Sequence, residues 1–449
     1  MPLARQYARF TSRLAWRDLP GGVRGVALEL FADWFANAAA GYGSPLTQAL
    51  LDLAPAAGGA VRVGDLQPAD PLSAALINAS AAHALEFDDS YRAGLYHPGA
   101  PVVSAAVSAA CHAGASGTEL LTGIVAGYEL SLRLAAAINP AHYKIWHTTG
   151  TVGAFGAAAA TARILGLTVE QTADAFGLAG TQAAGLWEVL PDAPLAKNLH
   201  PAKAAHSGLL AALLAQRGIE GPKTIFEGKQ GFFAATVPTE VDFGQCIAGL
   251  GEQWLTPETT FKAYPACGHT MTPIEAALQL SGKVAAGDIE TIEVRAHPVS
   301  LQVAGETNPL TGAQAKFSIP YCVAVALYRG RVELEEFAPE TLADQDVRRL
   351  LGRIALIADD TLGHVPSQRP ARITVRLANG ESLSAQAEVR KGDPERPMTA
   401  AEKREKCVRL AASAWGREGA ENVIAAVSAL PEASSVLTWA EGLRGFIDT

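Results

Sequence analysis

Residues 373–389 read ITVRLANGESLSAQAEV, and this pattern separates one part of the chain from the rest. Apolar and polar residues alternate on both sides of Asn379-Gly380, which is typical of two antiparallel strands joined by a tight turn. Residues 292–296 alternate in the same way and predict a further strand. Strands of this kind, with helices between them, indicate a separate α+β domain over residues 257–397.

Inside this region three helices are expected. The stretch Thr272-Pro273-Ile274-Glu275 combines an N-cap, a first-turn proline and a capping-box glutamate, which predicts a helix that begins there and ends near Ala286. Apolar periodicity predicts two more helices, over residues 320–328 and 342–357.

Outside this region the pattern is helical. Residues 21–254 consist of apolar segments separated by Gly, Pro and Asn, with start signals at Asp70-Pro71 and at Thr168 with Gln171. A capping box of Thr399 and Glu402 begins the last helical region. We therefore expect a mostly α protein, in which both chain ends form a large all-helical domain (1–256 plus 398–449) around an inserted α+β domain.

Composition excludes several classes of protein. The 449 residues are 49% hydrophobic and 18% charged with a net charge of −9, which argues against a disordered chain and against a general nucleic-acid or anionic-membrane binder. Five scattered cysteines fit reduced thiols. No secretory signal is visible, and the apolar stretch 102–115 is shorter than a membrane span. We expect a soluble, cytoplasmic protein.

Metal and nucleotide motifs are not found in the sequence. The ten histidines form no H-E-x-x-H spacing, and the acidic group Glu86, Asp88 and Asp89 has no calcium-loop pattern. Gly150, Gly153 and Gly156 are spaced G-x-x-G-x-x-G without a preceding strand, so we interpret them as glycines that let helices pack closely.

Two polar segments lie at expected helix edges in the first half of the chain. In residues 83–99, a helix ends in three carboxylates, and the following loop brings His97 back within their reach. Such carboxylates can fix the tautomer of an imidazole that acts as acid or base, although they could equally cap neighbouring helices. His147 comes just before a helix N-terminus, where it could meet an anion or serve as a cap.

Two further segments carry positive charge. Lys197 and His200 precede Pro201, and Lys203 follows one turn later. Like charges at the positive end of a helix are unfavourable unless an anion binds there, which favours a functional role. Lys262 and His269 lie near the expected domain boundary, where ligands commonly bind. Between them, Cys267 is a possible nucleophile, although a thiol among small residues is more often simply buried.

Together these segments resemble the MmgE/PrpD family, whose members include 2-methylcitrate dehydratase, cis-aconitate decarboxylase and iminodisuccinate epimerase. The resemblance covers most of the chain in the order of the family: residues 83–99, 127–129, 147–156, 177–185, 197–208, 226–232, 261–269 and 315–321. It implies a large helical domain with a smaller inserted α+β domain, a homodimer, and catalysis with no metal and no organic cofactor.

Matching the motifs residue by residue implies a catalytic set: Glu86, Asp89, His97, His147, Lys197 and His269. Members of the family commonly have aspartate at the position of Glu86, so the acidic role either falls to Glu86, Asp88 or Asp89 or has changed in this chain. Substrate-binding charge is expected from His200, Lys203 and Lys262, and no metal ligand is expected.

The resemblance implies a lyase that moves a proton next to a carboxylate of a small polycarboxylate substrate. A dehydratase similar to 2-methylcitrate dehydratase is the first expectation. An epimerase of the iminodisuccinate type and a decarboxylase of the cis-aconitate type are alternatives. A non-catalytic polycarboxylate-binding protein is an alternative of another class, and a helical scaffold would leave the gathered Lys and His residues unexplained.

Overall fold

The computed structural model describes residues 1–55, 58–189, 194–363 and 369–447. The chain divides into two compact units, Met1–Phe261 with Thr399–Thr449 and Lys262–Met398. Helices account for 59% of the chain and strands for 9%, so the predicted mostly α class is confirmed. We call them the first and second unit.

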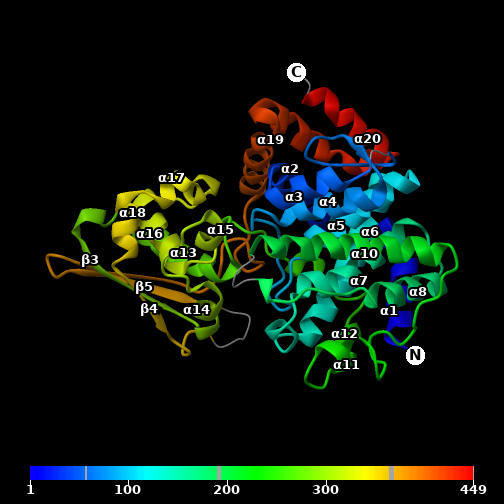
Figure 1. Cartoon of the computed structure of the whole chain (residues 1–449), viewed down its shortest axis with the longest axis horizontal. Coiled ribbons are helices and arrows are strands. Elements are labelled where there is room, and N and C mark those ends of the chain that lie inside the picture. Colours follow the sequence, from blue (N-terminus) through cyan, green and yellow to red (C-terminus); the bar gives the residue numbers. More distant parts are fainter. Residues whose placement is uncertain (56–57, 190–193, 364–368, 448–449) are drawn as a thin grey trace. The chain divides into compact units, whose positions relative to one another are not determined.

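The first unit is built around α7 (Thr148–Ile164), which packs against α5 (Gly99–Ala113), α6 (Gly117–Ile138), α8 (Val169–Gly180) and α10 (Leu199–Gln216) (Figure 1). Its glycines allow this close approach. A Cβ atom on Gly153 would lie 2.8 Å from Cγ of Pro101, and one on Gly156 would lie 2.8 Å from Cγ2 of Val102. The interpretation of these glycines as packing residues is confirmed.

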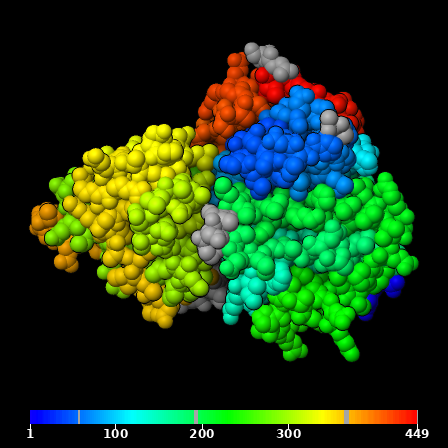
Figure 2. Space-filling view, in the orientation of Figure 1, coloured from blue at the N-terminus to red at the C-terminus, as the bar shows by residue number. Residues whose placement is uncertain are grey.

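Both ends of the chain contribute to this unit. The helix α19 (Ala400–Ser428) packs on α2 (Gly21–Ala40), and Figure 2 shows the red C-terminal surface against the blue N-terminal one. The other elements of the unit are α1 (Leu3–Arg13), α3 (Pro45–Leu53), α4 (Pro71–His83), α11 (Phe232–Thr236), α12 (Phe243–Ile247), α20 (Val436–Gly442) and the two-stranded sheet of β1 (Ala60–Val61) and β2 (Pro68–Ala69).

The predicted helix starts of this unit are found where expected. The Asp70 carboxylate accepts the N–H groups of Leu72 and Ser73 at 3.0 and 3.1 Å, which begins α4. Thr168 with Gln171 and Thr399 with Glu402 form complete capping boxes at α8 and α19. Local side-chain chemistry therefore sets these helix ends.

Helix α6 is long and apolar enough to cross a membrane, but 89% of its most apolar window is buried in the structure. Burial of this extent is the pattern of a core helix. The five cysteines are also buried.

The second unit contains a four-stranded sheet in the order β4-β3-β5-β6. The strands β3 (Ile289–Ala296), β5 (Ala371–Leu377) and β6 (Ser382–Ala387) pair antiparallel, and Gly380 at φ +88° turns the chain between β5 and β6. The helix α13 (Met271–Leu280) packs on β5 and β6. The remaining helices are α14 (Pro298–Ala304), α15 (Gly312–Ala315), α16 (Ile319–Arg329), α17 (Pro339–Leu342) and α18 (Gln345–Leu351).

Two local predictions in this unit are wrong. The helix expected over residues 342–357 ends at Leu351, and β4 (Ile354–Ala358) instead pairs parallel with β3. A short apolar run fits a helix or an edge strand equally well, and pairing with β3 decides between them. The expected cap Thr272 lies inside α13, which begins at Met271 and ends at Leu280, and Glu275 accepts the Tyr264 hydroxyl at 2.7 Å instead of capping the helix.

Candidate active site

Two histidines at the end of α4 and in the loop before α5 share one carboxylate. Nδ1 of His83 lies 2.7 Å from Oδ2 of Asp88, and Nδ1 of His97 lies 3.6 Å from the same oxygen. Nδ1 of His97 also lies 2.9 Å from the backbone carbonyl oxygen of Asp89. Because a carbonyl oxygen only accepts, Nδ1 carries the proton and the lone pair of the neutral ring is on Nε2. His97 is therefore held in the tautomer of a general base.

Asp89 fixes the backbone around His97. Its Oδ1 accepts the Gly99 N–H at 3.0 Å, and its Oδ2 accepts the Tyr128 hydroxyl at 2.8 Å. Only glycine fits at position 99, because a Cβ atom there would overlap Oδ1 of Asp89. Burial, together with the charge of Asp88, raises the pKa of Asp89 to about 8. Asp89 thus holds the loop through both its side chain and its carbonyl group.

Lys197, in the short 3-10 helix Pro194–Asn198, forms a buried ion pair with Glu86. The two side chains are only 5% and 9% exposed. Glu86 has φ +56°, a left-handed conformation that is uncommon for a residue with a side chain. A buried ion pair beside a strained backbone position is typical of a functional site, because both cost folding free energy.

His147 is the N-terminal cap residue of α7 and pairs with His200 of α10. Their Nδ1 atoms lie 3.0 Å apart, so one ring donates and the other accepts. Burial, helped by the charge of Lys197, lowers the pKa of His147 well below its usual range, and burial lowers the pKa of His200 to about 4. Both rings are therefore neutral near pH 7. The Trp187 ring packs on His147 with 4.4 Å between centroids.

These groups form one cluster. The His83 ring centroid lies 5.1 Å from that of His97 and 5.9 Å from that of His147. We use the name imidazole cluster for His83, Glu86, His97, His147, Lys197 and His200. It combines one base of fixed tautomer, one coupled pair of neutral imidazoles and one ammonium group, which together can remove or deliver protons beside an anion.

Three of the side chains in this region also carry metal-ligand atoms. His83, Asp88 and His97 offer ligand-type atoms within 4.8 Å of one another. A metal-binding nitrogen must carry no proton, whereas Nδ1 of His97 faces a carbonyl oxygen and Nδ1 of His83 is at hydrogen-bond distance from a carboxylate. These contacts favour hydrogen-bonded imidazoles over a metal site at the Nδ1 atoms.

The remaining predicted site residues are Lys203, in the first unit, and Lys262 and His269, in the second. Lys203 is exposed on α10, and its Nζ lies 3.4 Å from Nδ1 of His206. Lys262 is fully buried in the second unit. His269 also belongs to the second unit, where it lies 3.2 Å from the Ser300 hydroxyl, and burial with the charges of two nearby arginines lowers its pKa to about 3.

Sequence reasoning assigned no role to His83, Tyr128 or Trp187, although each contacts a predicted site residue. A signal was present for Tyr128, whose hydroxyl group lies inside the apolar helix α6. For Trp187 we see no signal in the sequence, because its contact with His147 depends on how two loops pack.

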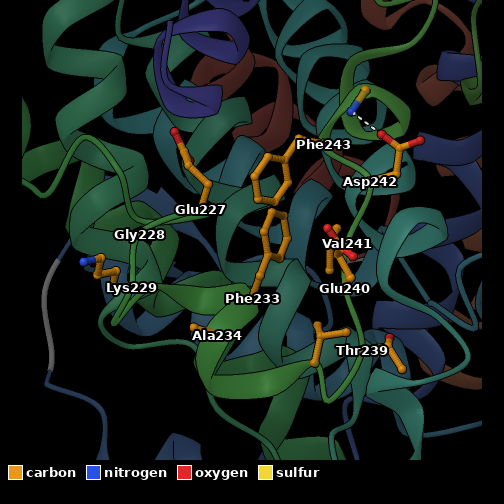
Figure 3. Close-up of a pocket in the computed structure, with 12 residues that line it drawn as sticks. Glu227, Gly228, Lys229, Phe233, Ala234, Thr239, Glu240, Val241, Asp242 and Phe243 are labelled. Carbon is orange, nitrogen blue, oxygen red and sulfur yellow. Dashed lines mark hydrogen bonds between the residues drawn. The ribbon is translucent and has the colours of Figure 1, made fainter.

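A cavity of about 790 Å³ is lined by residues between Glu227 and Gly244, none of which belongs to the imidazole cluster (Figure 3). In it, Phe233 and Phe243 stack with centroids 5.7 Å apart, and Glu227, Glu240 and Asp242 outnumber the single cation, Lys229. Three carboxylates would repel an anionic ligand. A second cavity of about 460 Å³ is lined in part by Leu85 and Asn198, the chain neighbours of Glu86 and Lys197.

Two family models match this chain, and several known proteins are similar to it. The model of the MmgE/PrpD N-terminal domain matches residues 5–243, and that of the MmgE/PrpD C-terminal domain matches residues 264–432. The cis-aconitate decarboxylase-like protein oryM of Aspergillus oryzae is 30% identical over 82% of this chain and 81% of its own length. Cis-aconitate decarboxylase of Aspergillus terreus is 30% identical over 74% and 73%. The 2-methylcitrate dehydratase of Cupriavidus necator is 30% identical over 50% and 49%.

Proposed function

Because the chain belongs to the MmgE/PrpD family and is an enzyme of that type, we propose that it is a lyase acting on a small tricarboxylate at the imidazole cluster. The observation that carries this proposal is the gathering of neutral imidazoles and one buried ammonium around residues 86–89. Imidazoles transfer protons near neutral pH, and an ammonium group stabilises the negative charge that develops beside a carboxylate.

Decarboxylation is the first candidate reaction. Two relatives that align over most of their length are named cis-aconitate decarboxylase-like protein and cis-aconitate decarboxylase, and the extent of this similarity supports decarboxylation. In this reaction the bond between carbon and the departing carboxylate breaks, carbon dioxide leaves, and the electron pair stays on carbon. The ammonium group of Lys197 then protonates that carbon and is left as a neutral amine, beside the neutral His147–His200 pair.

Dehydration is the second candidate, and the tautomer of His97 favours it. Nε2 of His97 would take a proton from the carbon next to a carboxylate, and the electrons of that C–H bond would form the double bond. The hydroxyl group would leave as water after receiving a proton from Lys197 or from an imidazole N–H. An epimerase would use the same groups on opposite faces of one carbon.

We also propose that catalysis needs no metal and no organic cofactor, because proton transfer next to a carboxylate can be carried out by the cluster's own side chains. A homodimer and a cytoplasmic location complete the proposal. Light scattering of the purified protein at several concentrations tests the dimer, and a constant monomer mass would contradict it.

The decisive experiment incubates the protein with cis-aconitate, citrate, 2-methylcitrate and iminodisuccinate in the presence of a chelator. Carbon dioxide release identifies a decarboxylase, a change in ultraviolet absorbance of an unsaturated acid identifies a dehydratase, and solvent deuterium uptake without net reaction identifies an epimerase. Thermal stabilisation by a tricarboxylate without turnover or exchange would indicate a binding protein instead. No effect of any compound would contradict the proposal.

A further inference from the structure

Three side chains from two helices meet at the backbone carbonyl group of Phe87. Nζ of Lys406, on α19, donates to this oxygen at 2.9 Å and lies 2.6 Å from Oδ1 of Asp33, on α2. The same ammonium group lies 4.2 Å from the centroid of the Phe87 ring. Asn37 Nδ2, also on α2, lies 3.2 Å from the other oxygen of Asp33 and 3.5 Å from the Phe87 carbonyl oxygen.

This arrangement is buried, and burying its charges costs folding free energy. Lys406 is 3% exposed, Asp33 is 2% exposed and Phe87 is 1% exposed. A buried ion pair usually stabilises a fold less than an apolar pair of the same size, so stability alone does not explain it. What an apolar pair would not supply is a charged donor for one particular carbonyl oxygen.

The Phe87 carbonyl group lies in the middle of residues 86–89, which contact the imidazole cluster or belong to it. Glu86, just before Phe87, pairs with Lys197 and has a left-handed backbone, whereas Asp88 and Asp89, just after it, orient His83 and His97. A left-handed residue with a side chain needs contacts from elsewhere to hold it. The Phe87 carbonyl belongs to the peptide group that joins Phe87 to Asp88, so holding it restrains the backbone between Glu86 and Asp89.

We propose that Lys406, supported by Asp33, is a positioning residue for the imidazole cluster. It does not touch substrate but holds residues 86–89 so that His97 keeps its proton on Nδ1 and Glu86 keeps its contact with Lys197. The inference rests on the proposed function for its catalytic consequence. It also means that α19, some 320 residues further along the chain, helps to hold the imidazole cluster in place.

The chain offers a matched control one turn earlier on the same helix. Nζ of Lys403 lies 2.6 Å from Oε2 of Glu29, also on α2, and 4.5 Å from the centroid of the Phe261 ring. Lys403→Met therefore removes an α19–α2 ion pair with a cation–π contact but leaves residues 86–89 alone. A displaced catalytic group costs up to roughly 100-fold in rate. We expect Lys406→Met to lower kcat by about 10- to 100-fold with a smaller change in KM, and Lys403→Met to stay within about twofold of wild type.

A double variant separates positioning from stability. Lys406→Met alone leaves the Asp33 carboxylate buried without its ammonium group, so a lower thermal midpoint is expected. Asp33→Asn with Lys406→Met removes this buried charge and should recover most of the midpoint, while kcat stays low because the Phe87 carbonyl still lacks its charged donor. Recovery of wild-type kcat in the double variant, or an equal loss in Lys403→Met, would overturn the proposal.

Nitrogen NMR of the protein labelled at histidine supplies a readout that needs no substrate. In wild type, His97, identified by its loss in His97→Gln, should show the Nδ1–H tautomer. The double variant should lose this signature, whereas His142, whose Nδ1 lies 3.2 Å from the Thr236 carbonyl oxygen, should keep its own. An unchanged His97 signal would overturn the positioning role. Wild-type inactivity on every test compound would instead refute the proposed function.

Discussion

Burial and hydrogen bonding shift the pKa of Asp89 in opposite directions. Two donors, the Gly99 N–H and the Tyr128 hydroxyl, favour its ionised form, but burial and the Asp88 charge dominate and raise its pKa to about 8. The folded protein therefore keeps this proton up to about pH 8, whereas an unfolded aspartate loses it near pH ~4. Between these values the native state binds more protons, so the contribution of Asp89 to stability falls as pH rises.

Asp89→Asn should remove this pH dependence. The amide keeps an oxygen for the Gly99 N–H and offers an N–H to Tyr128, and it cannot ionise. We expect the difference in unfolding free energy between variant and wild type to shift in favour of the variant from pH 5 to pH 8 and then to level off. Urea unfolding at pH 5, 7 and 9 measures it. A difference that stays constant with pH would show that Asp89 is ionised throughout.

Lys197 forms a buried ion pair and has a proposed chemical role, and variants can separate the two. Lys197→Ala removes the ammonium group that faces the buried Glu86 carboxylate, and loss of one partner of a buried ion pair costs up to about 3–5 kcal/mol. Glu86→Gln with Lys197→Met should recover most of that stability, because the two neutral side chains need no ion pair. Turnover should remain at least about 100-fold below wild type, since no ammonium group faces the developing charge. Urea unfolding and steady-state kinetics on the active substrate measure both effects. Wild-type turnover in the double variant would rule out a chemical role for Lys197.

At the scale of elements, the glycine face of α7 determines how closely the helices of the first unit pack. Gly153→Ala would place a Cβ atom 2.8 Å from Cγ of Pro101 and 3.3 Å from Cβ of Ala204. Neither neighbour has a flexible end that can move aside. We expect a loss of about 1–3 kcal/mol in unfolding free energy, measured by urea denaturation.

Gly25→Ala is the matched control for that substitution. Gly25 lies at an exposed position inside the helix α2, and a Cβ atom there would meet nothing within 4 Å. The same change should therefore stabilise the protein by about 0.5–1 kcal/mol through helix propensity. A stabilising effect at Gly153 as well would mean that α7 has room to move.

At the scale of the whole molecule, the first unit depends on both ends of the chain. The helix α19 buries Cys407, Val408, Leu410 and Ala411, and it packs on α2. A fragment of residues 1–261 should therefore expose the matching face of α2 and fail to unfold cooperatively. Adding a second fragment of residues 399–449 should restore a cooperative transition, followed by circular dichroism in urea. A cooperative transition of residues 1–261 alone would show that the C-terminal segment is dispensable for folding.

The second unit is formed by one continuous segment of the chain, unlike the first. Its own core joins the inward residues of β3 and β5 with α13, α16 and α18. Residues 262–398 alone should therefore give a cooperative unfolding transition. A fragment without such a transition would mean that this core is insufficient on its own.

Much of this architecture could be predicted from local patterns. Alternation at residues 373–389 predicts the hairpin, and the side chains of Asp70, Thr168 and Thr399 predict three helix starts, because each signal acts within a few residues of itself. The order of polar motifs pointed to the family that the comparisons show. These are properties of short segments, and neighbouring residues are sufficient to produce them.

Other features depend on contacts between distant segments. Residues 354–358 form the strand β4 and not the expected end of a helix, because they pair with β3. Thr272 does not cap α13, because this helix already begins at Met271. The proton position on His97, the raised pKa of Asp89 and the contact of Lys406 with Phe87 likewise require packing. Burial and the direction of a hydrogen bond exist only when separate elements meet, and no local pattern encodes which carbonyl oxygen a side chain will face.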